Sequence, residues 1–280
     1  MPVSPLPEAP APCAVIGLGP VGLSLTALLA ALGHPVWAAE HDPLRRAQLL
    51  AGQLPFHEPG LGETLAQVYT QVRYVPTSLD FPGDVTWVYL CVGTPGTPGG
   101  AVDLTALDRA WETLLSRAVV PPFIVLRSTL PLGAAERYQA DLSRRAPGAV
   151  LLYQPEFLQE SRAMTGVFFP DRLVIGGPTA AAQQLAQLQR PVTEGTLQTP
   201  TLTRPPGWTP APVQRVSLTE ATLIKLATNA FLAMKISFAN EISDLCEHAG
   251  ADMRTVSAGL GLDPRIGAAF LDPRVRPRLG

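Results

Sequence analysis

Residues 14–22 read AVIGLGPVG, and the apolar sequence LSLTALLAALG follows directly at residues 23–33. An apolar run, a glycine-rich turn and a second apolar run predict a β-strand, a tight turn and an α-helix. Gly17 allows the tight turn, Gly19 lets backbone approach a pyrophosphate, and Gly22 lets the helix pack closely on the strand. Unpaired N–H groups at the helix start favour phosphate. The candidate phosphate-binding residues are Gly17, Gly19, Val21 and Gly22, although a glycine turn of this kind also occurs for purely structural reasons.

An acidic residue stands where the second strand should end. The apolar residues 36–39 precede Glu40, which lies roughly 20 residues past the turn, where such a residue accepts hydrogen bonds from a ribose diol. A carboxylate there disfavours a 2′-phosphate and therefore favours NAD over NADP. Arg45 and Arg46 follow closely and could accept a phosphate instead, or lie on a solvated helix face. Glu40 and Arg45 are both kept as candidate cofactor-binding residues.

Composition indicates a protein with a large core. The chain has 280 residues, 46% hydrophobic and 16% charged, which predicts more than one folding unit. Its net charge of −2 gives no electrostatic case for binding nucleic acid or an anionic membrane. The apolar run near the N-terminus does not resemble a signal peptide or membrane span, because no Lys or Arg precedes it and Pro20 interrupts it.

The three cysteines lie in unlike contexts. Cys13 and Cys91 fall in apolar strand-like runs and Cys246 in a predicted helix. No CxxC motif or His cluster suggests a metal site. We therefore expect buried free thiols, no metal and a reducing, cytoplasmic location.

Thirty prolines gather mainly in two places, residues 1–12 and 191–212. The first segment is predicted to be a disordered tail and the second a linker or long loop. We expect residues 13–212 to form a Rossmann-type, NAD-binding domain ending in that linker, and residues 213–280 to form a helical domain.

Strands and helices are predicted to alternate through the first domain. Further strands are expected at residues 72–75, 84–93, 123–126 and 150–153, between helices at 43–53, 104–117 and 133–145. This order predicts an α/β fold with a doubly wound parallel sheet, whose ligands bind outside the carboxyl ends of the strands. Gly93, Thr94, Thr129 and Glu156 follow three of these strands and are candidates to line the cleft. Each alone could instead be a helix cap or turn residue.

A single long helix is predicted over residues 219–249, about 30 residues and hence roughly 45 Å long. Lys225 and Asn229 are one turn apart and share a side of it. They could be an exposed lysine with an incidental asparagine. If that side closes on the cleft, the ammonium and the amide could instead stabilise a substrate oxyanion.

Several segments together resemble one family. GLGPVGLSL, EPGLGETL, VGTPGTP, RSTLPLG, QPEFLQES with PDRLVIGG, EATLIKLATNAFLAMKISFANEISDLCEHAGAD and GLGLDPRIGAAFL occur in the order seen in the UDP-glucose dehydrogenase family, and span nearly all of residues 14–271. The PEFL and PDR segments look more like the UDP-glucose enzymes than the UDP-N-acetylmannosamine enzymes. The resemblance implies an NAD-dependent, four-electron oxidation of a UDP-sugar C6 alcohol to a carboxylate through a cysteine thioester. It also implies a homodimer built on helix 219–249.

The same resemblance implies roles for the cofactor-side residues. Glu40 would hold the adenosine ribose, and Thr94 and Thr129 would line the nicotinamide side. Glu156 would manage water and proton transfer, and Glu160 would lie beside the cofactor.

On the substrate side, the resemblance implies that Lys225 and Asn229 stabilise the oxyanion. Phe157 and Leu158 would contact the sugar nucleotide through their backbone, and Arg265 would reach across the dimer to the partner's substrate. The candidate catalytic residues are therefore Thr129, Glu156, Lys225 and Asn229.

The chain departs from the family pattern at its end. Family members continue into a glycine-rich run and GGSCFPKD, whose cysteine is the nucleophile, whereas residues 272–280 read DPRVRPRLG. None of the three cysteines matches that position. We expect a chain truncated before the cysteine motif and the UDP-binding domain, with NAD binding retained and turnover absent or severely impaired. The alternatives are a non-catalytic NAD-binding or dimerising module, a UDP-N-acetylmannosamine-type enzyme, and a hydroxyacid dehydrogenase that transfers a single hydride.

Overall fold

The computed structural model describes residues 10–159 and 161–271. The chain divides into two compact units, residues 1–223 and 224–280. The boundary between them falls inside one long helix.

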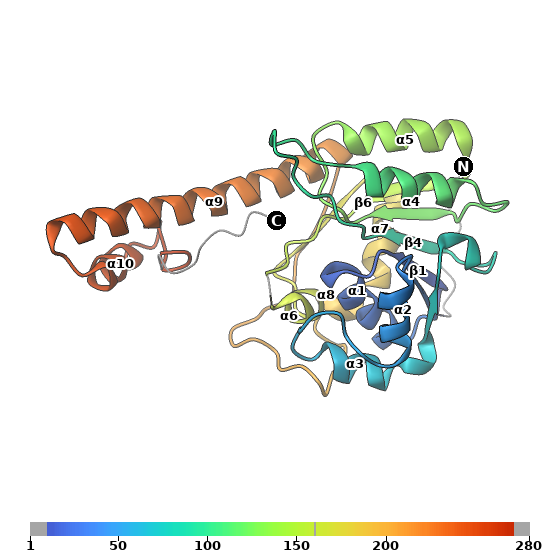
Figure 1. Cartoon of the computed structure of the whole chain (residues 1–280), viewed down its shortest axis with the longest axis horizontal. Helices are drawn as coiled ribbons and strands as arrows, with labels where there is room; N and C mark the ends of the chain where they lie inside the picture. The colour runs from blue at the N-terminus through green and yellow to red at the C-terminus, as the bar shows by residue number, and fades with distance from the viewer. Residues whose placement is uncertain (1–9, 160, 272–280) are drawn as a thin grey trace. The chain divides into compact units, whose positions relative to one another are not determined.

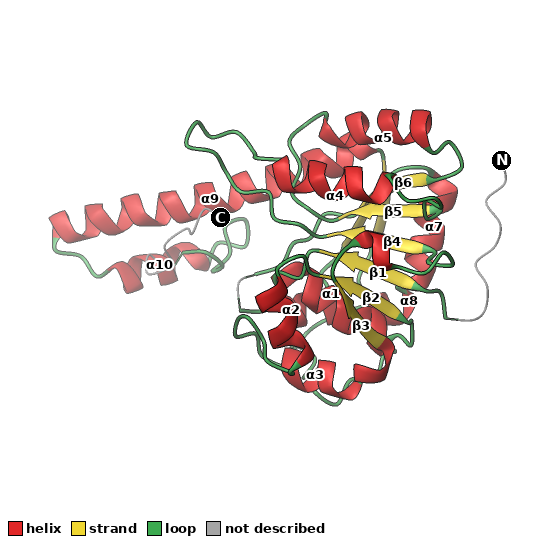
Figure 2. Cartoon of the chain, turned by 45° about the vertical axis from the view of Figure 1, so that its right-hand side comes forward, coloured by secondary structure: helices red, strands yellow, loops and turns green. Residues whose placement is uncertain are grey.

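Within the described residues, the first unit contains one sheet of eight strands in the order β3-β2-β1-β4-β5-β6-β7-β8 (Figure 2). Neighbouring strands run parallel except for β6 and β7, which are antiparallel. The strands are β1 (Cys13–Ile16), β2 (Val36–Ala39), β3 (Val72–Val75), β4 (Trp87–Leu90), β5 (Phe123–Leu126), β6 (Val150–Tyr153), β7 (Leu173–Gly176) and β8 (Val213–Val216). The predicted doubly wound parallel sheet is confirmed, and β7 and β8 extend it beyond the predicted strands.

Helices flank both faces of this sheet (Figure 2). They are α1 (Pro20–Ala31), α2 (Pro43–Leu50), α3 (Leu61–Gln67), α4 (Thr105–Leu115), α5 (Ala134–Arg145), α6 (Ala163–Phe168), α7 (Thr179–Leu188) and α8 (Arg190–Thr193), with 3-10 turns η1 (Tyr69–Gln71) and η2 (Ser78–Asp80). Helix α1 is buried from Gly22 through Ala30 because its sequence is apolar on nearly every side. Within the sheet, the side chains of Trp87 in β4 and Phe123 in β5 stack on each other, with ring centroids 4.2 Å apart.

The predicted disordered tail is only partly described. Residues 1–9 lie outside the described part of the chain. Residues 10–12 are ordered, so the prediction is wrong for them: Ala11 is buried and its N–H donates to His34 Nδ1 at 3.1 Å. The Pro12 carbonyl accepts the N–H of Thr86 at 2.9 Å, which ties this segment to the start of β4.

The proline-rich segment 191–212 is part of the first unit, and its first three residues belong to α8, so the predicted loop is observed only from residue 194 onward. The indole N–H of Trp208 donates to the Pro170 carbonyl at 3.0 Å, and its ring packs edge-on against Phe169. Residues 213–216, expected at the start of the helical domain, instead form β8 and pair with β7. The sheet therefore continues past the predicted boundary.

The long helix α9 (Leu218–Ala249) confirms the helix predicted at 219–249, and α10 (Met253–Gly261) follows it in the second unit (Figure 1). Ile236, Ala239 and Cys246 of α9 are buried, and Cys246 Sγ lies 3.9 Å from Met253 Sδ of α10. Among the described residues, α9 is also the helix whose length and mean hydropathy of 1.2 would suffice to cross a membrane. Core helices of other proteins meet the same criterion.

Candidate functional site

The three glycines of the turn after β1 differ in whether the backbone there could carry a side chain. Gly17 has φ +89, and a Cβ there would lie 2.9 Å from the backbone of Val92. A Cβ on Gly22 would lie 1.9 Å from the Gly17 carbonyl oxygen. Gly19 has an ordinary φ of −75, and a Cβ on it would meet no described atom within 4 Å. Gly17 and Gly22 are thus needed for folding, whereas Gly19 keeps open the space in front of α1.

That open space adjoins the N-terminus of α1. Gly19 is the N-cap and makes no side-chain cap, and the described first turn contains no acidic residue. Pro20 has no N–H, so the helix start presents the N–H groups of Val21 and Gly22, which have no intrahelical acceptor. Two outward N–H donors beside an uncovered backbone suit a pyrophosphate.

Glu40 lies at the end of β2 and is only 3% exposed. Its Oε1 accepts the N–H of Asp42 at 3.0 Å, and Arg45 lies 3.9 Å from Oε2. Arg46 donates instead to the Glu40 backbone carbonyl at 2.8 Å. A buried carboxylate held at this strand end suits a ribose diol and opposes a 2′-phosphate, and the turn and Glu40 together fit a dinucleotide such as NAD.

The ends of β4 and β5 are joined by side-chain hydrogen bonds. Thr94 Oγ1 donates to the Thr129 carbonyl at 2.9 Å, so these two predicted site residues lie together. Ser128, which the sequence analysis did not single out, is buried and donates from Oγ to the Val92 carbonyl at 2.6 Å. Gly93 is exposed, and a Cβ on it would meet no described atom within 4 Å. The roles of Thr94, Thr129 and Gly93 toward a cofactor stay predictions.

Residues 154–159 follow β6 and contain three of the predicted site residues. The Glu156 carboxylate accepts the N–H of Leu158 at 2.6 Å. The Arg172 guanidinium lies 4.0 Å from the centre of the Phe157 ring. The Leu158 N–H is therefore engaged, and a backbone contact from Phe157 or Leu158 to a sugar nucleotide stays a prediction. Glu160 lies outside the described residues.

The structure also places three buried residues side by side across β4, β5 and β6, a row that the sequence analysis missed. Cys91, Arg127 and Gln154 each follow their strand by one residue and are joined to the neighbouring strand by backbone hydrogen bonds of 2.8, 2.9 and 2.9 Å. All three are buried, and Gln154 exchanges side-chain hydrogen bonds with Gln189. The equal offset from β4, β5 and β6 is the sequence signal that could have revealed the row.

Burial governs the chemistry of the thiol in that row. It raises the pKa of Cys91 to about 12, against a smaller opposing effect of the Arg127 charge. Burial also raises the pKa of Cys13 in β1. Because the thiolate is the reactive form, neither thiol is a ready nucleophile.

The remaining predicted residues belong to the second unit. Lys225 is 4% exposed and Asn229 is exposed one turn further along α9. The exposed Arg265 is paired with Asp263, Nη2 to Oδ2 at 2.6 Å. The convergence of Lys225 and Asn229 with Glu156, and the reach of Arg265 to a partner chain, stay predictions.

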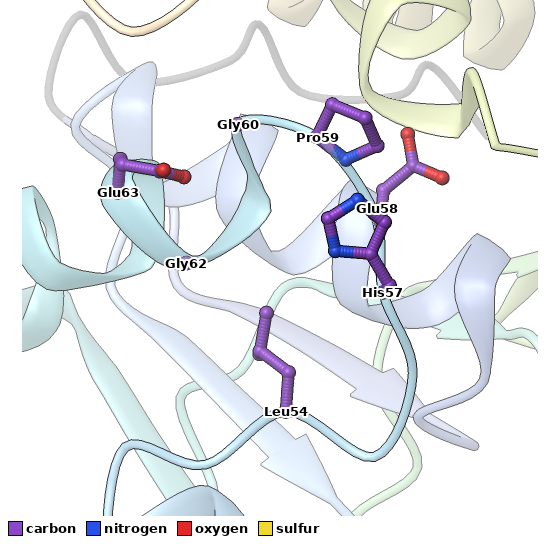
Figure 3. Close-up of a pocket in the computed structure, with 7 residues that line it drawn as sticks. All are labelled: Leu54, His57, Glu58, Pro59, Gly60, Gly62 and Glu63. Carbon is purple, nitrogen blue, oxygen red and sulfur yellow. The ribbon is translucent and has the colours of Figure 1, made fainter.

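A pocket of about 460 Å³ lies beside α3 (Figure 3). It is lined by Leu54, His57, Glu58, Pro59, Gly60, Gly62 and Glu63. Its one buried carboxylate, Glu58, accepts the N–H of Met164 at 3.0 Å. Across residues 10–159 and 161–271, no cluster of three His, Cys, Asp or Glu side chains could hold a metal ion.

An open glycine turn at the start of α1 and a buried acidic residue at the end of β2 define a dinucleotide-binding domain of the dehydrogenase type. Residues 11–192 match the NAD binding domain of the UDP-glucose/GDP-mannose dehydrogenase family, and residues 219–276 match its central domain. The chain therefore belongs to the UDP-glucose/GDP-mannose dehydrogenase family, and its cofactor is NAD.

Individual relatives agree with this assignment. The chain is 34% identical to the UDP-glucose 6-dehydrogenase AglM of Haloferax volcanii, over 92% of this chain and 59% of that protein. It is also 34% identical to the UDP-glucose 6-dehydrogenase TuaD of Bacillus subtilis, over 92% and 54%. The chain thus spans between 54% and 59% of the length of these two relatives.

Solved structures show the same architecture. A UDP-glucose dehydrogenase from Pyrobaculum islandicum superposes with a TM-score of 0.81 at 30% identity, covering 96% of this chain and 60% of that one. A GDP-mannose dehydrogenase from Pseudomonas aeruginosa gives a TM-score of 0.79 at 25% identity, covering 90% and 56%.

Proposed function

We propose that this chain is the NAD-binding and central part of a nucleotide-sugar dehydrogenase that oxidises the C6 alcohol of UDP-glucose to a carboxylate. The observation that carries the proposal is the combination of the open space at Gly19 with the buried Glu40 at the end of β2, in a domain of this family. UDP-glucose is favoured because the curated relatives AglM and TuaD are UDP-glucose 6-dehydrogenases. The NAD-binding part comprises the sheet through β8, and the helical part begins with α9.

The proposed chemistry needs a group that accepts and donates protons and a group that offsets the negative charge of an oxyanion. Oxidation of a primary alcohol to a carboxylate takes up one water, removes four electrons and thereby reduces two NAD. Glu156 would accept protons from the alcohol or from water, and Thr129 would line the nicotinamide side. Lys225 and Asn229 would offset negative charge on the substrate oxygen. Buried Lys225 suits this role, since an ammonium acts more strongly away from water.

A nucleophilic thiol is the part of the family chemistry for which residues 1–280 offer no suitable group. The chain has three cysteines, and all three are buried. The raised pKa values of Cys13 and Cys91 keep those thiols protonated. We therefore expect residues 1–280 by themselves to bind NAD without sustained turnover, as a non-catalytic module would.

The first test is NADH formation, followed by absorbance, when purified chain is given NAD with UDP-glucose. We expect NAD binding and at most about one NADH per chain, because the aldehyde formed by the first hydride transfer finds no thiolate to carry the second oxidation. Sustained release of two NADH per UDP-glucose would contradict the expected impairment. Sustained NADH formation from small hydroxyacids, with none from UDP-glucose, would contradict the nucleotide-sugar assignment.

We further propose that two chains pair through α9, in the cytoplasm. Phe231, Met234, Phe238 and Leu245 are exposed along α9 at spacings of three, four and seven, which form one apolar stripe. Three buried free thiols fit a reducing compartment. Sedimentation equilibrium should give the mass of two chains, and Phe238→Glu should shift it toward one, whereas Leu50→Glu, exposed on α2, should not. A single-chain mass at every concentration, or recovery of the protein in membranes, would contradict this proposal.

A further inference from the structure

A buried carboxylate links two loops that are distant in the sequence. Glu58 precedes α3 and is 5% exposed, and its side chain points away from Leu54, another residue of the same pocket (Figure 3). Its Oε1 accepts the N–H of Met164 at 3.0 Å, across 106 residues of sequence. Met164 is the second residue of α6, so Glu58 acts as a cap on that helix.

The start of α6 has no cap of its own. Its N-cap residue, Arg162, makes no side-chain capping hydrogen bond. Ser161 just before it has φ +60, in the left-handed region that favours glycine. Such a conformation persists only where surrounding contacts fix it. The carboxylate of Glu58 satisfies one N–H of the first turn, that of Met164, with a charge that suits a helix N-terminus.

Helix α6 in turn holds the residues after β6. A Cβ on Gly166 of α6 would lie 2.9 Å from Leu158 Cδ2, so Leu158 packs where α6 has no side chain. The N–H of Leu158 donates to the Glu156 carboxylate at 2.6 Å. A continuous set of contacts therefore runs from Glu58 through α6 and Leu158 to Glu156.

Glu58 is itself held on a rigid support. Gly60 has φ +80, and a Cβ there would lie 2.4 Å from Leu202 Cδ2 of the proline-rich loop. Thr64 Oγ1 lies 2.7 Å from Thr201 Oγ1 of the same loop. These contacts fix the turn that carries Glu58, so its carboxylate is a stable anchor for α6.

We propose that Glu58 is a positioning residue, which sets Glu156 and Leu158 in place for the sugar nucleotide by capping α6. The inference rests on the proposed function for the role of Glu156. The hydrogen bond of Glu58 is made to Met164, so its influence on Glu156 passes through α6. The consequence is that removing its acceptor oxygen should disturb substrate binding and leave the NAD site intact.

The test compares Glu58→Ala with Glu58→Gln, which keeps an acceptor oxygen in place. Hydrogen exchange of the amide of Met164 reports the cap, and saturation-transfer NMR with NAD present reports binding of UDP-glucose. For Glu58→Ala we expect exchange at least about tenfold faster and UDP-glucose affinity at least about fivefold weaker, with NAD affinity unchanged. Glu58→Gln should restore both quantities to within about twofold of the wild type.

An unchanged rate of hydrogen exchange at the Met164 amide in Glu58→Ala would overturn the proposal. Equal losses of NAD affinity and UDP-glucose affinity would also overturn it, because a general loss of folding would cause that result. If Glu58→Ala does not fold, Glu58→Asp withdraws the carboxylate by one methylene and should show the same pattern. A wild-type chain that gives no UDP-glucose signal would contradict the proposed function, while exchange at Met164 would still decide whether Glu58 caps α6.

Discussion

Gly22→Ala should lower the free energy of unfolding by about 3 kcal/mol, the upper part of the range for overpacked cores. A Cβ at this position would lie 1.9 Å from the Gly17 carbonyl oxygen and 3.3 Å from Cys91 Cβ. The nearest obstacle is backbone of a tight turn, which cannot rotate away as the end of a side chain could. The urea midpoint of unfolding, measured by circular dichroism, checks this expectation.

Gly62→Ala is the matched control for that substitution. Gly62 also lies in the first turns of a helix, α3, but a Cβ there would lie 3.5 Å from Leu54 Cδ1, an ordinary contact distance. Alanine is favoured over glycine inside helices by about 1 kcal/mol, so the control should be as stable as the wild type or more so. If Gly22→Ala unfolded at the wild-type midpoint, the close packing of α1 on β1 would be contradicted.

Gly19→Val should weaken NAD binding by on the order of 100-fold, or about 2.7 kcal/mol, and change stability by no more than about 1 kcal/mol. The φ of −75 suits any residue, and a Cβ on Gly19 would meet no described atom within 4 Å. The new side chain would therefore enter the space in front of Val21 and Gly22 without disturbing the fold. It would keep a pyrophosphate from N–H donors whose bonds to charged groups are each worth about 1.5–3 kcal/mol.

Gly83→Val separates loss of the site from the general effect of adding a side chain. Gly83 likewise has no described atom within 4 Å of a Cβ, but it precedes β4 and so lies at the opposite edge of the sheet. Isothermal titration should give the wild-type NAD affinity for this variant. Wild-type affinity in Gly19→Val as well would show that NAD does not approach the turn.

The fold was predictable from sequence where apolar runs were long and bounded by turn residues. The strands β1, β2, β4, β5 and β6 have that form, since their segments are mostly apolar and each is followed by a turn or a helix, whereas β3 reads VRYV. Strand β8 reads VQRV, with half of its residues polar. Strand β7 reads LVIG and is as short as the other strands, and it pairs antiparallel to β6, which departs from the alternation of parallel strands and helices. Strand β7 pairs with β6 and with β8, and β8 pairs with β7, which a local pattern does not reveal.

The site was predictable to the extent that spacing along the chain fixes it. The glycine turn and Glu40 follow from the order of strand, turn and helix. The contact between Glu58 and Met164 joins segments far apart in the sequence, so no local pattern predicted it. The row containing Arg127 and Gln154 could be read only by comparing the residues that follow three separate strands. The spacing of Lys225 and Asn229 on one helix was readable, but their relation to the NAD-binding unit was not.

The most direct test of the central claim, that residues 17–22 and Glu40 form an NAD site, is equilibrium binding of NAD and NADP to the wild-type chain. Buried Glu40 at the ribose position predicts one NAD per chain, bound at least about tenfold more tightly than NADP, a difference of about 1.4 kcal/mol. No binding of NAD, or equal binding of the two nucleotides, would contradict the claim.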